Sequence, residues 1–281
     1  MLTKMAVRKR LRVMKILRKL KELTASPLAS LRHVSLISLL VLPVSFATTG
    51  CSSTPKIDPA TPEGAYKLAE EYEKDERFEE SVAKYTDVKN KHPYSRFATL
   101  AEMKIADVQF KRDAFIEAQY AYQTFKDLHP KHPQIDYVTF RLGLSIFNQL
   151  PSTTDRDLSL ATKAILYFDE VLTSYSQSQY AKEAGEKKNE ALRMLADKEL
   201  YIANFYLKKK QYGSALGRYE SLLRQYGNIV DFGPPALYGA AVSAKETGDR
   251  DKQNRFVNTL LTQYPGSSEA SKAKSEFRDG R

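Results

Sequence analysis

The stretch LAEEYEKDERFEESVAKYTDVKNKHP, residues 68–93, decides the fold. In its second half, Ser81, Tyr85 and Val88 follow one another at spacings of four and three residues. Residues at these spacings share one face of a helix, so a small, an aromatic and an aliphatic side chain lie in one row. Pro93 ends the pattern, because proline cannot continue a helix. The stretch therefore predicts a helix that buries one narrow face.

The same row of side chains recurs along the chain. Each copy ends in an aromatic or histidine marker, at His92, His129, Tyr175, Tyr226 and Tyr264. An apolar residue lies four positions before every marker; before the first four markers, an aromatic lies at seven positions and a small residue at eleven. Repetition of this kind is typical of stacked helical repeats. Because the body of the chain lacks the alternation typical of strands, it is predicted to be all-α.

The pattern resembles the tetratricopeptide repeat, a pair of helices with large, small and aromatic residues at fixed places. The first repeat has the consensus spacing throughout, at Leu68, Ala69, Tyr72, Ser81, Tyr85, Val88 and Pro93. The fourth matches at Ile202, Ala203, Tyr206, Ala215, Tyr219 and Leu222. The resemblance implies an α-solenoid of about five helix pairs. The fifth repeat has Gln253 where a small residue is expected, as suits a terminal cap.

Two intervals between markers carry extra sequence. In the third repeat it is the polar stretch NQLPSTTDRD, residues 148–157, which is predicted to be a loop. In the fourth repeat the extra residues are predicted to lengthen a helix, roughly Gln179 to Lys209. Gly185 lies inside that helix and costs about 1 kcal/mol relative to alanine, so we expect an irregularity there.

The first fifty residues have the composition of an export signal. Ten Lys or Arg and one acid lie between Met1 and His33, and a nearly uncharged run follows at residues 34–46. The run is too short and too interrupted to cross a bilayer as a stable helix, and it fits the apolar core of a signal peptide.

Cys51, the only cysteine, follows the small residues 47–50 and has no partner for a disulfide within the chain. Small side chains before a cysteine resemble a lipobox, which implies that residues 1–50 are a lipoprotein signal peptide and that Cys51 carries acyl chains. The alternative is an ordinary signal with an incidental cysteine. Several acyl chains would anchor the protein nearly permanently. In bacterial lipoproteins, a serine directly after the lipidated cysteine, here Ser52, implies sorting to the outer membrane. Residues 51–60 are then the lipidated cysteine and a flexible linker.

The net charge of +10 invites a nucleic-acid interpretation, but the signal segment carries most of it. The chain from Cys51 onward contains 34 of the 44 basic residues and 33 of the 34 acidic residues, so its charges nearly balance. A surface that releases many counterions on binding a nucleic acid is therefore absent from the mature chain. We expect no nucleic-acid partner.

The sequence contains no motif that argues for catalysis. It has no Gly-rich phosphate loop, no nucleophile elbow, and no cysteine and histidine that could act together. His129 and His132 lie three residues apart but among prolines, at a repeat junction rather than on a helical face. We expect no cofactor, no metal and no enzyme activity. A site assembled from titratable groups of distant repeats is the alternative left open.

One block is more specific than the generic repeat. The stretch HPKHPQIDYVTFRLGLS, residues 129–145, resembles a signature of the BamD family, the lipoproteins of the outer-membrane β-barrel assembly machine. The matching residues are His132, Pro133, Ile135, Asp136, Tyr137, Val138, Gly143 and Leu144, reinforced by Asp155-Arg156-Asp157 and Ser178-Gln179-Tyr180.

This resemblance implies a lipid-anchored scaffold on the periplasmic face of the outer membrane. Its implied partners are the POTRA domains of a BamA-like barrel subunit, other assembly lipoproteins and unfolded outer-membrane proteins. Residues 61–150, the N-terminal repeats, would be the substrate side, and residues 151–281, the C-terminal repeats, the complex-assembly side. Arg218 falls where the family has an arginine that contacts the last POTRA domain. The alternative is a lipoprotein scaffold of another envelope system, a pilotin or a peptidoglycan-coordinating protein.

Solenoid geometry adds candidates for a substrate groove. The first helix of each pair lines the concave face, and residues off its packing row are expected to point into that face. These are Tyr66, Met103, Asp107 and Phe110. Exposed there, they would suit an extended segment of varied sequence. The alternative is that Tyr66 and Phe110 pack between repeats.

Overall fold

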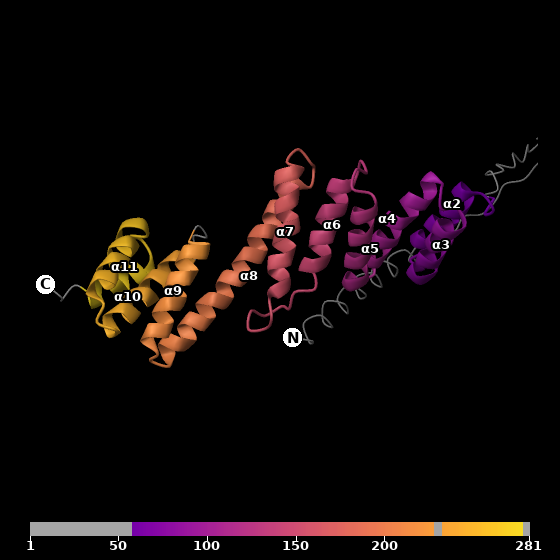
Figure 1. Ribbon diagram of the computed structural model, residues 1–281. Coiled ribbons are helices and arrows are strands. Elements are labelled where there is room, and N and C mark those ends of the chain that lie inside the picture. Colours follow the sequence, from indigo (N-terminus) through magenta and orange to yellow (C-terminus); the bar gives the residue numbers. More distant parts are fainter. Residues whose placement is uncertain (1–57, 228–231, 278–281) are drawn as a thin grey trace, which may run out of the picture. The chain divides into compact units, whose positions relative to one another are not determined.

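The computed structural model describes residues 58–227 and 232–277. These residues form helices and no strand, so the all-α prediction is confirmed. The helices are α2 (Pro62–Lys74), α3 (Phe78–Lys91), α4 (Arg96–Lys111), α5 (Phe115–Leu128), α6 (Ile135–Phe147), α7 (Ser159–Ser174), α8 (Ala181–Lys208), α9 (Tyr212–Tyr226), α10 (Gly233–Glu246), α11 (Arg250–Gln263) and α12 (Ser268–Glu276) (Figure 1).

Each helix from α2 to α11 packs against the helix that follows it in the sequence. The helices form five successive pairs, α2 with α3 through α10 with α11, and α12 packs on the last pair. This arrangement is the predicted α-solenoid of helix pairs. The short helix α12 is an addition that the repeat pattern did not predict.

The predicted row of side chains forms the core. Its aromatic position is fully buried in the four repeats that have one, at Tyr85, Tyr122, Phe168 and Tyr219. The small position before it is also fully buried, at Ser81, Ala118, Ala164 and Ala215. Burying a large apolar side chain contributes roughly 1.5–3 kcal/mol, so these repeated positions supply much of the driving force for stacking.

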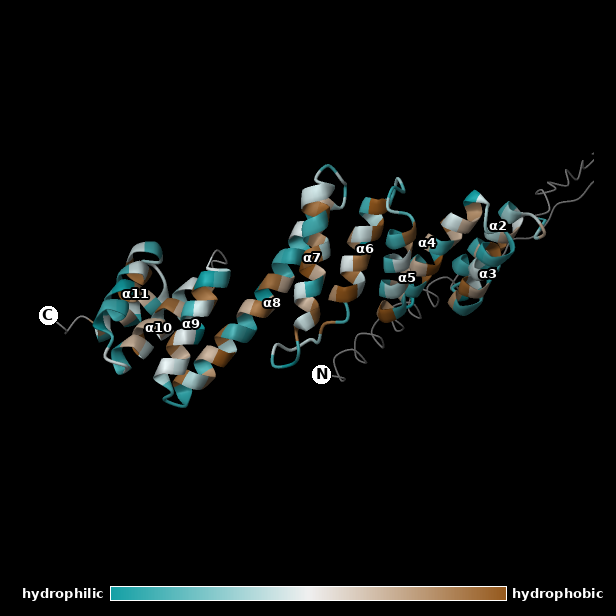
Figure 2. Cartoon of the chain, viewed as in Figure 1, coloured by the Kyte–Doolittle hydropathy of each residue, from teal (hydrophilic) through white to brown (hydrophobic). Residues whose placement is uncertain are grey.

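The helices differ in how much apolar surface they carry. Figure 2 shows mostly hydrophobic residues along α6 and mostly hydrophilic ones along α11. Nine residues of α6 are buried, against only Phe256 and Leu260 of α11. The difference follows from position, because α6 packs between two neighbouring pairs while α11 belongs to the last pair of the stack.

Tight turns join the helices of four pairs. Each turn has one residue with positive φ: Glu76 (58°), Asp113 (60°), Lys210 (59°) and Gly248 (79°). The next residue in each turn donates its backbone N–H to a carbonyl of the preceding helix, for example Arg77 to Tyr72 at 2.9 Å. This closure satisfies carbonyls that the end of a helix would otherwise leave free.

The two insertions lie where the sequence predicted them. Residues 148–158 connect α6 to α7 without a helix, and α8 is a single helix of 28 residues. The expected irregularity at Gly185 is wrong, because α8 runs through that residue without a break. Within residues 58–227 and 232–277, none of the helices combines the length and apolar character that crossing a bilayer requires. The predicted signal peptide, residues 1–50, the predicted lipidation site Cys51 and the predicted linker up to residue 57 lie outside the described residues.

Candidate functional site

A buried polar cluster joins α4, α5 and α6. Asp107 of α4 is 9% exposed and accepts two hydrogen bonds on the same carboxylate oxygen, from the hydroxyls of Tyr122 at 2.6 Å and Tyr137 at 2.7 Å. Burial raises the pKa of both tyrosine hydroxyls, and the nearby Asp107 raises it further. Both hydroxyls therefore stay protonated and act as donors. A buried carboxylate needs such partners, because an unpaired one is strongly destabilising.

Arg141 of α6 completes this cluster. Its Nε donates to the Tyr122 hydroxyl at 3.2 Å, and its guanidinium carbon lies 3.6 Å from the centre of the Phe110 ring. A cation over an aromatic face contributes about 0.5–2 kcal/mol, depending on how far it is desolvated. Phe110 therefore packs under the guanidinium of the partly buried Arg141.

The predicted groove residues are mostly internal. Tyr66, Met103 and Asp107 are 9%, 6% and 9% exposed, and only Phe110 is partly exposed. The expectation that they stand exposed is wrong for the first three. Tyr66, for instance, packs its ring 5.5 Å from that of Phe97 in the next repeat. These side chains hold repeats together, and a substrate-binding role for them stays a prediction.

A second polar node joins the first two repeats. Glu73 of α2 is buried, accepts a hydrogen bond from Tyr85 at 3.0 Å, and pairs with Lys104 at 3.6 Å and with Lys111. Burial alone would raise the pKa of Glu73, but Lys111, Lys104 and Tyr85 outweigh it and lower the pKa. The carboxylate is therefore a charged link between α2, α3 and α4.

The repeat pattern by itself did not predict these nodes, although the sequence contains a signal for them. Tyr122 bonds to Asp107 fifteen residues earlier, and Tyr219 bonds to Asn204 at the same spacing and the same 2.6 Å. A buried tyrosine hydroxyl needs a partner. A polar residue fifteen positions before a core tyrosine is the sequence pattern that would have predicted such a hydrogen bond.

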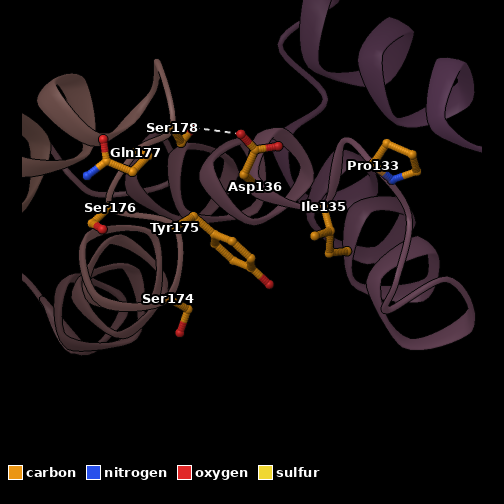
Figure 3. Close-up of a pocket in the computed structure, with 8 residues that line it drawn as sticks. All are labelled: Pro133, Ile135, Asp136, Ser174, Tyr175, Ser176, Gln177 and Ser178. Atoms are coloured by element: carbon orange, nitrogen blue, oxygen red, sulfur yellow. Dashed lines mark hydrogen bonds between the residues drawn. The ribbon is translucent and has the colours of Figure 1, made fainter.

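The two signature stretches meet at one junction. Ser178, in the turn between α7 and α8, donates a 2.7 Å hydrogen bond to Asp136 at the start of α6 (Figure 3). Two residues further on, the Tyr180 ring stacks on Phe140, with centroids 5.4 Å apart and planes 16° apart. Beside this junction lies a pocket of about 340 Å³, lined by Pro133, Ile135, Asp136 and residues 174–178 (Figure 3).

The third signature element, residues 155–157, lies in the loop that precedes α7. Asp157 accepts hydrogen bonds from the backbone N–H and hydroxyl of Ser159, at 3.0 and 2.8 Å. Those bonds lower the pKa of Asp157. Lys198 of α8 donates to the carbonyl of Arg156 at 2.8 Å. The element therefore fixes the loop against the long helix.

Arg218 lies on α9, the second helix of the fourth pair, as predicted. Its side chain is 46% exposed and pairs with Glu199 of α8 at 3.3 Å. On α8, the aromatic side chains of Tyr201 and Phe205 follow Glu199 in the sequence and are exposed. An exposed ion pair contributes at most about 1 kcal/mol, so Glu199 holds Arg218 only weakly.

The histidine pair has local partners of its own. His129 Nε2 lies 2.7 Å from a Glu102 carboxylate oxygen, and the His132 ring packs edge-on against Phe125. Within the part of the chain that the structure describes, no three His, Cys, Asp or Glu side chains gather as metal ligands would.

The stacked pairs and their polar nodes define a helical-repeat protein of the tetratricopeptide type. Residues 58–232 match the model of the YfiO outer-membrane lipoprotein family, and the chain belongs to that family. It is similar to the outer membrane protein assembly factor BamD of Neisseria meningitidis serogroup A, with 25% identity over 68% of this chain and 77% of the relative. BamD of Rickettsia prowazekii is 27% identical over 68% and 75%. Among solved structures, the TPR2AB domain of yeast Sti1 gives a TM-score of 0.43 at 11% identity, over 79% of this chain and 86% of that one.

Proposed function

We propose that this protein is an outer-membrane protein assembly factor that works as a scaffold, by positioning other polypeptides rather than by bond chemistry. The observation that carries the proposal is the junction of Asp136 with Ser178, which unites the two signature stretches in a chain of the YfiO family. Relatives that share this family are named outer membrane protein assembly factors.

The C-terminal repeats, residues 151–281, are proposed to bind the POTRA region of a BamA-like barrel subunit and other assembly lipoproteins. Arg218 supports this assignment by its exposure and its weak intramolecular partner. A partner carboxylate could replace Glu199 at little cost, and a desolvated arginine at an interface is often a hot spot.

The N-terminal repeats, residues 61–150, are proposed to receive unfolded outer-membrane proteins. Acyl chains on Cys51 are proposed to hold the scaffold at the periplasmic face of the outer membrane. One acyl chain binds a membrane only marginally, so stable anchoring requires more than one.

Depleting the protein in its host tests the proposal as a whole. We expect outer-membrane barrels to fail to assemble, and mass spectrometry of the native protein to find an acylated Cys51. Normal barrel levels after depletion, or co-purification of a secretin or a cell-wall enzyme instead of a barrel subunit, would contradict it.

Arg218 is tested by charge reversal. Arg218→Glu should weaken binding of soluble POTRA domains at least tenfold, because the new carboxylate repels the partner that the arginine attracts. Arg224→Glu, an exposed arginine on the same helix, is the matched control and should bind like the unchanged protein. Equal binding by both variants would remove Arg218 from the interface.

A further inference from the structure

The guanidinium of Arg141 is held on one side and open on the other. Its Nε donates to the Tyr122 hydroxyl at 3.2 Å, whereas its Nη1 and Nη2 atoms form no hydrogen bond with any described residue. Among the described residues, Gln109 Oε1 is the buried side-chain polar atom that lacks a hydrogen-bond partner. Since neither Nη atom of Arg141 is buried in that way, both reach solvent. The outer edge of the guanidinium is therefore available to a ligand.

Aromatic rings fix the plane of this guanidinium. Its central carbon lies 3.6 Å from the centre of the Phe110 ring and 5.8 Å from that of Tyr137. Phe110 is held in turn by Phe115, with ring centroids 5.1 Å apart and planes at 70°. A planar guanidinium that is already stacked and hydrogen-bonded loses little freedom when it binds a ligand. Arg141 is thus arranged for binding before a ligand arrives.

The positive charge of Arg141 is balanced only indirectly. Within the part of the chain that the structure describes, no carboxylate forms an ion pair with it. The carboxylate that acts on it most strongly is that of Asp107, and the Tyr122 hydroxyl lies between the two. This hydroxyl accepts the Nε–H of Arg141 and donates to Asp107 at 2.6 Å. A direct ion pair would occupy the fork of the arginine, and this arrangement leaves the fork open.

We propose that Arg141, stacked on Phe110, binds a carboxylate of a polypeptide that the scaffold holds. The fork of an arginine matches the two oxygens of a carboxylate, which it binds through two parallel hydrogen bonds. The site follows from the contacts of Arg141, and the assignment of the carboxylate to a polypeptide rests on the proposed function. A chain-terminal carboxylate and an Asp or Glu side chain share this chemistry, so the test separates these two sources.

The surroundings of Arg141 favour a carboxylate over a phosphate group. A phosphate monoester carries up to two negative charges near neutral pH, and proteins recognise it with clusters of arginines. Among the described residues, Arg141 is the one cation in contact with Phe110, Tyr122 and Tyr137. The nearby Asp107 further disfavours a second negative charge on the ligand. The site therefore suits an anion with a single charge.

The test is a nuclear magnetic resonance titration of the full-length chain in detergent, with isotope-labelled arginine. The signal followed is the Nε–H of Arg141, which is identified by its loss in Arg141→Lys and by its shift in Phe110→Leu, where the ring current is removed. The probes are three acetylated peptides of Gly, Ser and Leu. The first has a free C-terminal carboxylate, the second an amidated end and a central Glu, and the third an amidated end and Gln in place of that Glu.

We expect both carboxylate peptides to shift the Arg141 signal to saturation, and the Gln peptide to shift it at least tenfold less at the same concentration. The carboxylate that binds more tightly identifies the source. Arg96 is the matched control in the same spectra. It is exposed and lies 4.9 Å from the centre of the Phe97 ring, but its Nε has no hydrogen bond among the described residues. Its signal should not saturate.

Variants separate binding from a structural role. Arg141→Lys keeps a positive charge near Asp107 but removes the fork, so it should keep its helicity and weaken binding of the carboxylate peptides at least tenfold. Saturation transfer to the peptide signals measures this binding without the Arg141 signal. Phe110→Leu, which removes the stacked ring, should weaken binding at least threefold, whereas Arg96→Lys should change nothing.

Several outcomes would overturn the proposal. These are no saturable shift from either carboxylate peptide, equal shifts from the Gln peptide, unchanged binding by Arg141→Lys, and inorganic phosphate that binds as tightly as the carboxylate peptides. If the site fails in these ways while depletion still blocks barrel assembly, the inference is wrong and the proposed function stands. Carboxylate binding at Arg141 together with normal barrel assembly after depletion would instead keep the site and remove the proposed function.

Discussion

Ser178 and Asp136 lie 42 residues apart in the sequence, and the serine hydroxyl donates a 2.7 Å hydrogen bond to the aspartate carboxylate. The same hydroxyl oxygen accepts the backbone N–H of Tyr180 at 3.2 Å, so one side chain fixes both its own turn and the start of α6. The turn at the start of the long helix α8 is thereby tied to the third pair.

The bond between Ser178 and Asp136 should be measurable in stability. Hydrogen bonds to charged groups contribute about 1.5–3 kcal/mol, and both residues here are only partly buried. We expect Ser178→Ala to lower the free energy of unfolding by about 1–2 kcal/mol, measured by urea denaturation.

A double-mutant cycle with Asp136→Asn isolates the pair. Coupling of at least about 0.5 kcal/mol is expected, because residues in direct contact do not act additively. Ser176→Ala, an exposed serine of the same turn, should be neutral. Additive losses from the two single changes would show that the bond contributes nothing.

Glu73 predicts a specific pH dependence. Its pKa is lower in the folded protein than in the unfolded chain, so its ion pairs with Lys104 and Lys111 stabilise the fold above the ordinary glutamate pKa. That contribution disappears as the pH falls through the lowered value. The free energy of unfolding of Glu73→Gln should therefore fall less than that of the unchanged protein between about pH 6 and pH 3.

Exposed Glu79 provides the control for Glu73, since its partner Arg112 is its only ion pair among the described residues and its side chain is 80% exposed. Glu79→Gln should keep the full pH dependence. If Glu73→Gln follows the same curve as the unchanged protein, the buried node does not carry the charge that its contacts indicate.

The fold was predictable because the buried face repeats. Tyr85 and Tyr219 mark the same position in different repeats, and both are fully buried, so the spacing alone identified the core. The contact between Asp136 and Ser178 has no such period. Its geometry depends on the length of α7 and of the turn after it, which no local pattern specifies.

The candidate site was predictable only in part. Arg218 was placed on the correct helix, but off-row residues such as Met103 were expected to be exposed. In the structure, neighbouring repeats cover Met103. The exposed apolar side chains Ile116 and Tyr120 lie instead on α5, the second helix of its pair. A spacing of four residues identifies a helix face and does not say whether another helix covers it.

Lys210 occupies a turn where glycine should be better. Its φ of 59° is in the left-handed region, which costs a non-glycine residue about 1–2 kcal/mol. Glycine avoids that cost but loses more conformational freedom on folding, so Lys210→Gly should raise the free energy of unfolding by about 0.5–1 kcal/mol. The measurement is urea denaturation.

Lys208→Gly is the matched control, because Lys208 is an exposed lysine two residues earlier and still within α8. Glycine in a helix interior costs about 1 kcal/mol, though less at a frayed end, so this change should destabilise. The same substitution is thus expected to act with opposite sign at two nearby sites. Destabilisation at both would mean that the turn at Lys210 is not strained.

Gly239 of α10 lies close against a side chain of the preceding repeat. A Cβ added there would lie 2.3 Å from the ring of Tyr219 on α9, which is fully buried and bonded to Asn204. The ring cannot move away without breaking that 2.6 Å bond, so Gly239→Ala should cost about 1–3 kcal/mol. The loss should appear in thermal and urea unfolding.

Gly217 gives the comparison that makes this result interpretable. It lies in α9, and a Cβ added there meets nothing within 4 Å. Gly217→Ala should stabilise by about 0.5–1 kcal/mol, since alanine is the better helix former. Opposite signs at the two glycines would establish that the fourth and fifth repeats pack through the Tyr219 ring. Stabilisation at Gly239 as well would mean that the two repeats have room between them, contrary to the close approach of α10 to that ring.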